Sequence, residues 1–296
     1  MGSSFNIRSF LSPRHWPVWL VIGLHRLLTL LPWRLQRLLG SAIGRLAARV
    51  ATRRKRIAEE NITIAFPDES DTTRATLVRE HFKNLGIGLF EIGMAWWASD
   101  RRIARLCDVS GLQHLAPADS PEATFLVAGH FTSIDMVARG LGLYADFDVI
   151  HRPLGIPLLD AFTQRGRLRS AKHLIDKRSP KALLTAVRQQ RSIWIAVDQA
   201  DTTSGSVDAP FFGRLAPTNT TVPRIAQKSG VRVVPISCIR DKRGRYQITL
   251  DPPLSDFGND IAGDAATLNT CVEQTVMRAP AQYYWIHRRY KTVERT

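Results

Sequence analysis

Residues 123–135 read ATFLVAGHFTSID, and this stretch decides the fold. Its apolar run, closed by Gly129 and His130, is typical of a buried strand. Apolar residues at helical spacing follow in residues 136–144, so Asp135 should lie in the first turns of a helix. Ligands of α/β sheets bind at the carboxyl ends of the strands. His130 and Asp135 are therefore the first candidates for a site that carries chemistry.

Downstream of this junction, short apolar runs alternate with helical stretches of roughly ten residues. Strands are predicted at residues 147–151, 192–198, 231–239 and 246–250, and helices at residues 157–166, 181–190, 222–230 and 265–279. Strands separated by helices need crossover connections, which place helices on both faces of a sheet. The sequence therefore predicts an α/β fold with a mixed, largely parallel sheet flanked by helices.

Upstream, residues 71–106 have helical periodicity and predict one or two helices after a break at Phe66-Pro67-Asp68. Residues 16–33 read WPVWLVIGLHRLLTLLPW, an apolar stretch of about one membrane thickness framed by tryptophans. The following residues, 35–56, carry leucines at helical spacing with arginines between them, which is typical of a helix on an anionic membrane surface.

These features predict an N-terminal membrane anchor with a basic amphipathic helix in residues 1–56 and a globular domain in residues 57–296. No small-residue cleavage site follows the apolar stretch, so we expect it to stay on the mature protein. The positive charge behind the anchor favours a cytoplasmic position for the globular domain. Three arrangements remain open: the segment spans the bilayer, lies in the bilayer interface, or packs on the protein's own core.

The charge and the cysteine content restrict which binding partners, metals and cofactors the sequence predicts. The formal net charge is +15, with 41 Lys and Arg against 26 Asp and Glu. Such an excess suits nucleic acid, an anionic membrane or an acidic protein equally well, but the chain lacks the interleaved aromatic and basic residues of a nucleic-acid module. The three cysteines are widely spaced, and no histidine pairs with a cysteine or another histidine at ligand spacing. We therefore expect no nucleic acid, no metal and no cofactor.

His130 and Asp135 suit acid–base chemistry. A carboxylate one turn into the helix can hold one ring nitrogen of His130 and steady its charged form, while the other nitrogen takes a proton from a hydroxyl. No serine stands in a G-x-S-x-G elbow. We therefore predict direct attack of a substrate hydroxyl on an acyl thioester, without an acyl-enzyme.

The chain resembles the late acyltransferases of lipid A biosynthesis, the lauroyl/myristoyl acyltransferase family of Gram-negative inner membranes. Besides the apolar N-terminal stretch, the resemblance is carried by RRKRIAEENITIAFPD (53–68), HFKNLGIGLFEIGMAWW (81–97), AGHFTSID (128–135), HRPLGIPLLDAFTQRGRLRS (151–170), WIAVDQ (194–199), PFFGRLAPT (210–218) and APAQYYWIHRRYKT (279–292).

The resemblance implies a glycerolipid acyltransferase-like fold, with residues 57–296 as the catalytic domain. It also implies transfer of a fatty acyl group from acyl carrier protein to a hydroxyacyl chain on a Kdo-bearing lipid A precursor, at the cytoplasmic face of the bacterial inner membrane. We expect a monomer. His130 would be the general base and Asp135 the residue that orients it.

The resemblance further assigns Arg167 and Asp198 to substrate binding or oxyanion stabilisation. Arg167 lies in a dense basic run and can stabilise an oxyanion or hold a phosphate, or it belongs to a solvated basic face. Asp198 closes the strand predicted at residues 192–198 and can fix Arg167 or a substrate group, or serve as a turn or cap residue.

One residue departs from the family pattern. Lipid A acyltransferases of this kind usually place Glu where this chain has Asp135, whereas glycerolipid acyltransferases use Asp. The first alternative is therefore an acyltransferase of the same superfamily that acts on a glycerophospholipid, a glycolipid or an ornithine lipid. The second is a basic membrane-associated binding protein without chemistry.

Overall fold

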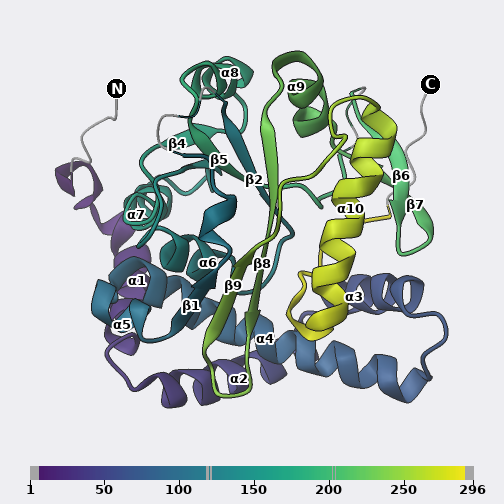
Figure 1. Ribbon diagram of the computed structural model, residues 1–296. Coiled ribbons are helices and arrows are strands. Elements are labelled where there is room, and N and C mark those ends of the chain that lie inside the picture. The colour runs from purple at the N-terminus through teal and green to yellow at the C-terminus, as the bar shows by residue number, and fades with distance from the viewer. Residues whose placement is uncertain (1–6, 118–119, 121, 202, 204, 291–296) are drawn as a thin grey trace.

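The computed structural model describes residues 7–117, 120, 122–201, 203 and 205–290. The first six residues of the predicted segment 1–56 and the last six of the predicted segment 57–296 therefore lie outside the described residues. Its centre is a seven-stranded sheet (Figure 1). In spatial order the strands are β1 (Cys107–Ser110), β9 (Tyr246–Leu250), β8 (Arg232–Arg240), β2 (Thr124–Ala128), β5 (Ser192–Ala196), β3 (Asp148–His151) and β4 (Leu174–Asp176). All neighbours pair parallel except β8 and β9, which a short turn joins. The predicted mixed, largely parallel sheet is confirmed.

Strand β2 is buried on both faces, which is why its sequence is a continuous apolar run. Phe125 and Val127 join one core, while Leu126 and Ala128 join the other, because successive side chains of a strand point to opposite faces. The first core is covered by α8 (Pro180–Arg188), α9 (Thr221–Ser229) and α10 (Ile261–Arg278), and the second by α6 (Ile134–Leu141) and α7 (Pro157–Arg167).

The long helix α4 (Asp71–Trp97) contributes to both cores and passes below the sheet in Figure 1. The short helix α5 (Asp100–Ala104) follows it, so the prediction of one or two helices in residues 71–106 is confirmed. Four short 3-10 turns complete the described helices: η1 (Ile7–Phe10), η2 (Pro13–His15), η3 (Leu112–His114) and η4 (Pro280–Gln282).

Four strands escaped sequence-based prediction, namely β1, β4 and the antiparallel hairpin of β6 (Val207–Phe211) and β7 (Arg214–Thr218). The hairpin turns at Phe212 and Gly213, whose φ angles of 49° and 70° are both positive. Positive φ at both turn positions matches the right-handed twist of paired strands. Phe212 is held in this uncommon conformation by ring contacts with Phe66 and Trp285.

The N-terminal region differs from the prediction. The apolar stretch of residues 16–33 does not form one helix: α1 (Trp16–Leu28) ends in a turn, Pro32 follows, and α2 (Trp33–Val50) begins. Thirteen residues of α1 span about 20 Å, less than the roughly 30 Å of a bilayer core. Within the described ranges, no helix combines the length and the apolar character needed to cross a membrane.

The basic amphipathic helix is also shorter than predicted, because residues 53–56 belong to a separate helix, α3 (Thr52–Ala65). Helix α2 packs closely on α4 through glycines: a Cβ added to Gly44 would lie 2.0 Å from the carbonyl oxygen of Phe82. Gly40 and Gly86 approach the partner backbone in the same way. One side of α2 thus packs on the protein's own body, as one of the alternatives for this segment proposed.

Candidate active site

His130 and Asp198 meet at the carboxyl edge of the sheet because of strand register. Strands β2 and β5 pair in parallel with Ala128 opposite Ala196, and each candidate residue lies two positions beyond its strand's last residue. The Nδ1 atom of His130 is 2.6 Å from Oδ1 of Asp198. The backbone N–H of His130 also donates to both carboxylate oxygens, at 3.0 Å each. Asp198 therefore binds both the ring and the main chain of His130.

This contact fixes the tautomer that the neutral imidazole adopts. A carboxylate only accepts hydrogen bonds, so Nδ1 carries a proton, and in the neutral form of the ring Nε2 is the nitrogen that has the lone pair. The side chain of Asp198 is 2% exposed, whereas that of His130 is 27% exposed. The pair thus has a buried anion behind a histidine that solvent and substrate can reach.

Asp198 stays ionised in this environment. Burial alone would raise its pKa, but the charge of His130, the hydrogen bonds from His130 and a hydrogen bond from the Tyr283 hydroxyl outweigh burial and lower the pKa to about 2. Burial and the charge of Asp198 raise the pKa of Tyr283 well above its ordinary value, so its hydroxyl remains a donor.

The C-terminal segment around Tyr283 also holds the loop that carries His130. The backbone N–H of Tyr284 donates to the carbonyl of His130 at 2.9 Å, and that of Thr132 donates to the carbonyl of Gln282 at 2.8 Å. Phe131 and Tyr283 form an antiparallel bridge between these two contacts. The site therefore depends on a segment some 150 positions away in the chain, by the numbering of the residues involved.

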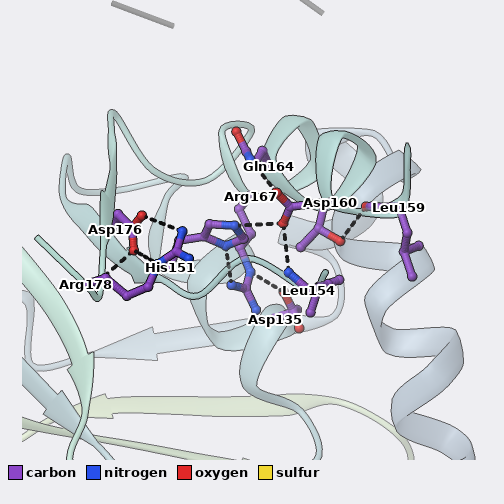
Figure 2. A network of polar contacts seen from close by, with 10 residues as sticks. Asp135, His151, Leu154, Leu159, Asp160, Gln164, Arg167, Asp176 and Arg178 are labelled. Atoms are coloured by element: carbon purple, nitrogen blue, oxygen red, sulfur yellow. Dashed lines mark hydrogen bonds and ion pairs between the residues drawn. The ribbon is translucent and has the colours of Figure 1, made fainter. Parts of the chain in front are cut away.

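Arg167 lies in a second group of residues, drawn in Figure 2. Its Nε is 3.5 Å from Oδ1 of Asp135, and its Nη1 is 3.0 Å from Nδ1 of His151. Nε2 of His151 is in turn 3.0 Å from Oδ1 of Asp160. The side chain of Arg167 is 29% exposed. A guanidinium held in this way can contact an anionic group of a substrate.

The partners of the four predicted residues are thus exchanged. The sequence pairs His130 with Asp135 and offers Arg167 as a partner for Asp198; the structure pairs His130 with Asp198 and Arg167 with Asp135. Asp135 lies in the first turn of α6, which contacts α7, the helix that ends at Arg167. Asp198 follows β5, the direct neighbour of the strand before His130.

A family comparison identifies the protein class. The model of a family described as bacterial lipid A biosynthesis acyltransferase matches residues 5–292 of the chain. The chain belongs to this family. It is an acyltransferase of lipid A biosynthesis, and the family and the enzyme class predicted from the sequence are confirmed.

Individual relatives of this lipid A acyltransferase match over nearly their whole lengths. A lipid A biosynthesis lauroyltransferase of Escherichia coli K12 is 36% identical over 96% of this chain and 94% of the relative. A palmitoleoyltransferase of the same organism is 35% identical, with 96% and 94% covered. A lipid A biosynthesis acyltransferase of Haemophilus influenzae Rd is 33% identical, with 96% and 93% covered.

Among solved structures, the 1-acyl-sn-glycerophosphate acyltransferase of Thermotoga maritima aligns with 85% of this chain and 99% of its own, at 16% identity and a TM-score of 0.39.

Sequence reasoning missed Tyr283, His151 and Asp160 in this lipid A acyltransferase. Tyr283 belongs to the quoted stretch of residues 279–292, but its tie to Asp198 is a contact between distant segments. His151 ends the strand β3 on the same sheet edge as His130, so its place at a strand end was a usable signal. Within the described part of the chain, no three His, Cys, Asp or Glu side chains are grouped to hold a metal ion.

Proposed function

We propose that the protein transfers a fatty acyl group from acyl carrier protein to a hydroxyl on a hydroxyacyl chain of a Kdo-bearing lipid A precursor, with His130 as general base. The observation that carries this proposal is the 2.6 Å contact of His130 Nδ1 with the buried Asp198. That contact leaves Nε2 as a proton acceptor on a partly exposed ring.

The proposed reaction is a direct transfer. Nε2 of His130 takes the proton of the acceptor hydroxyl while the hydroxyl oxygen attacks the thioester carbonyl carbon. This attack forms the new C–O bond and gives the tetrahedral intermediate. Its collapse restores the carbonyl and breaks the C–S bond, and the imidazolium gives its proton to the leaving sulfur. Asp198 stays ionised throughout and stabilises the imidazolium.

The cysteines offer no competing nucleophile. Burial raises the pKa of Cys107 to about 12 and that of Cys271 to about 11. Burial also raises the pKa of Cys238, which is fully enclosed. The thiolate is the nucleophilic form of cysteine, so these side chains stay unreactive at neutral pH. This supports direct attack over an acyl-enzyme.

Arg167 and Asp135 form the proposed electrostatic part of the site. The guanidinium of Arg167 would stabilise the oxyanion of the tetrahedral intermediate or hold a phosphate of the acceptor. Asp135 would act by holding Arg167 at Nε, since Asp198 occupies Nδ1 of His130. The basic residues of positions 165–178 would receive the acidic surface of acyl carrier protein.

Incubation of the purified protein with lauroyl-acyl carrier protein and a Kdo-bearing lipid A precursor should add one lauroyl group to the precursor. Mass spectrometry of the extracted lipid measures the gain. Lysophosphatidate serves as the competing acceptor, because Asp135 matches the glycerolipid pattern. Acylation of lysophosphatidate without acylation of the precursor would replace the proposed acceptor with a glycerophospholipid.

We further propose that α1 and α2 attach the protein to the inner membrane by lying in the bilayer interface. Both helices expose large apolar side chains: Leu20, Val21, Leu24 and Leu27 on α1, and Leu35, Leu38, Leu39, Ile43, Leu46 and Val50 on α2. Exposed arginines stand among them at positions 26, 34, 45 and 49. Apolar side chains flanked by cations are the composition that anchors interfacial helices in anionic leaflets.

The double substitution Leu20→Glu and Leu24→Glu should weaken binding to vesicles of phosphatidylethanolamine and phosphatidylglycerol by about 100-fold, because each leucine buried in lipid contributes about 1.5 kcal/mol or more. Co-sedimentation with the vesicles measures it. Leu215→Glu is the control, since Leu215 is 64% exposed on the β6–β7 hairpin and Leu20 is 74% exposed on α1. Equal loss of binding in both proteins would exclude α1 as the attachment surface.

A further inference from the structure

We propose that His151 is a positioning residue that holds the guanidinium of Arg167 in place for acyl transfer. This inference rests on the proposed role of Arg167. It concerns a residue that the acid–base pair does not use, at the carboxyl end of β3 beside α7 (Figure 2).

Hydrogen bonds link Asp160 through the ring of His151 to Arg167. Asp160 is fixed first: its Oδ2 accepts from Nε2 of Gln164 at 2.8 Å, and its Oδ1 accepts from the backbone N–H of Leu154 at 3.3 Å. His151 spans the gap between Asp160 and Arg167 with its two ring nitrogens, each at 3.0 Å from its partner. The side chain of His151 is 5% exposed, so packing restricts the ring as well.

The chemistry of the two partners decides which ring nitrogen of His151 donates a hydrogen bond and which accepts one. A guanidinium only donates hydrogen bonds, so Nδ1 of His151 must accept and Nε2 must carry the proton. Nε2–H then donates to Asp160, which only accepts as a carboxylate. The hydrogen bond from Arg167 to Nδ1 requires the neutral ring. A protonated Nδ1 would be a donor with a positive charge and would repel the guanidinium.

The surrounding charges favour that neutral ring. Burial lowers the pKa of His151 most, and the charge of Arg167 lowers it further, while Asp160 and Asp176 oppose them. The guanidinium of Arg178 donates two hydrogen bonds to Asp176 on β4, at 3.2 and 3.0 Å. The net direction is downward, so His151 keeps its Nδ1 lone pair at neutral pH.

Loss of this acceptor would free the Arg167 side chain. Asp135 would remain as a contact, at 3.5 Å from Nε, but the Nη1 side of the fork would have no fixed partner from His151. An arginine that must stabilise a transition state loses effectiveness when it has to be ordered during the reaction. The loss should therefore fall on kcat more than on KM.

Two substitutions separate the two ring nitrogens. His151→Asn places an amide oxygen near the position of Nδ1 and can still accept from Arg167, but it loses the contact with Asp160. His151→Gln places its amide near the position of Nε2 and keeps the contact with Asp160, but it offers Arg167 no acceptor. We expect kcat to fall by roughly 10- to 100-fold in His151→Gln and by less than about 5-fold in His151→Asn. Melting temperatures report any shared loss of stability.

A double-mutant cycle with Arg167→Ala tests whether His151 acts through Arg167. Once Arg167 is absent, His151→Gln should cause no further loss of kcat, because residues that act through one another are not additive. A full additional loss in the Arg167→Ala background would overturn the proposal. So would wild-type kcat in His151→Gln alongside a slow Arg167→Ala enzyme, or equal losses of kcat in the two His151 variants.

These outcomes differ from a failure of the proposed function. If the wild-type protein transfers no acyl group to the lipid A precursor, the proposed function itself is wrong. If the wild-type protein is active and Arg167→Ala is equally active, the role of Arg167 is wrong and the role of His151 falls with it.

Discussion

Replacing His130 with alanine should lower the rate of acyl transfer by about 10³- to 10⁴-fold, the upper range for loss of a positioned general base. The variant should still fold, because the His130 side chain is 27% exposed and belongs to neither apolar core. Transfer from lauroyl-acyl carrier protein, followed by mass spectrometry of the acceptor lipid, measures the rate. Circular dichroism confirms that the secondary structure remains.

The chain supplies a matched control for this substitution. His173 also pairs with a buried carboxylate, with Nδ1 2.8 Å from Oδ1 of Asp148. That pair lies where β3 and β4 begin, at the opposite edge of the sheet from His130. His173→Ala should therefore leave the transfer rate unchanged. Near wild-type transfer by the His130→Ala enzyme would end the general-base proposal.

Replacing Asp198 with asparagine should lower kcat by roughly 10³- to 10⁴-fold, comparable to the loss of His130, because the histidine would take the wrong tautomer. The backbone N–H of His130 needs an acceptor, so the amide oxygen should turn toward it. The amide NH₂ would then face Nδ1 and donate to it, which puts the ring proton on Nε2. A protonated Nε2 cannot accept a proton from the hydroxyl.

Asp135→Asn is the informative comparison, because it leaves the contact between His130 and Asp198 intact. It should act through Arg167 and cost about 10- to 100-fold, less than Asp198→Asn. If Asp135→Asn instead costs as much as His130→Ala while Asp198→Asn is mild, His130 is oriented by Asp135 during catalysis, as the sequence alone suggested.

The same pair makes stability depend on pH. The pKa of Asp198 is lowered from 3.8 in the unfolded chain to about 2 in the folded protein. The folded state therefore binds fewer protons than the unfolded chain between these values. The stabilisation, about 2 kcal/mol, is fully present above pH 3.8 and is lost as the pH falls through 2. Urea unfolding should show Asp198→Asn less stable than wild type at neutral pH, with the difference vanishing near pH 2.

Much of the fold was predictable because apolar runs and helical periodicity in the sequence indicate its strands and helices. The apolar run before His130 indicates a strand buried on both faces, and β2 does contribute alternate side chains to two cores. The strands missed by the prediction are short or carry polar residues, such as Cys107–Ser110 and Leu174–Asp176. Their pairing depends on neighbours that are distant in sequence, so local periodicity is weak there.

In the N-terminal segment, the apolar pattern of the sequence predicted the structure incorrectly. Its mean apolar character is that of one long helix, but α1 ends at Leu28, and Pro32, which lacks a backbone N–H, stands at the N-cap of α2. The glycines of α2 then fit against α4, which turns one side of this amphipathic helix toward the protein. Counting apolar residues reveals neither the break between α1 and α2 nor the packing of α2 on α4.

By itself, the sequence predicted that His130 and Asp198 stand at the ends of two strands and that Asp135 lies in the first turns of a helix, and the family resemblance added Arg167 to these candidates. Only the tertiary structure decided their partners. Covalent spacing makes His130 and Asp135 neighbours in the chain, but strand order and register are set by packing across the whole sheet. Parallel pairing of β2 with β5 brings Asp198 to His130, and contact of α6 with α7 brings Asp135 to Arg167.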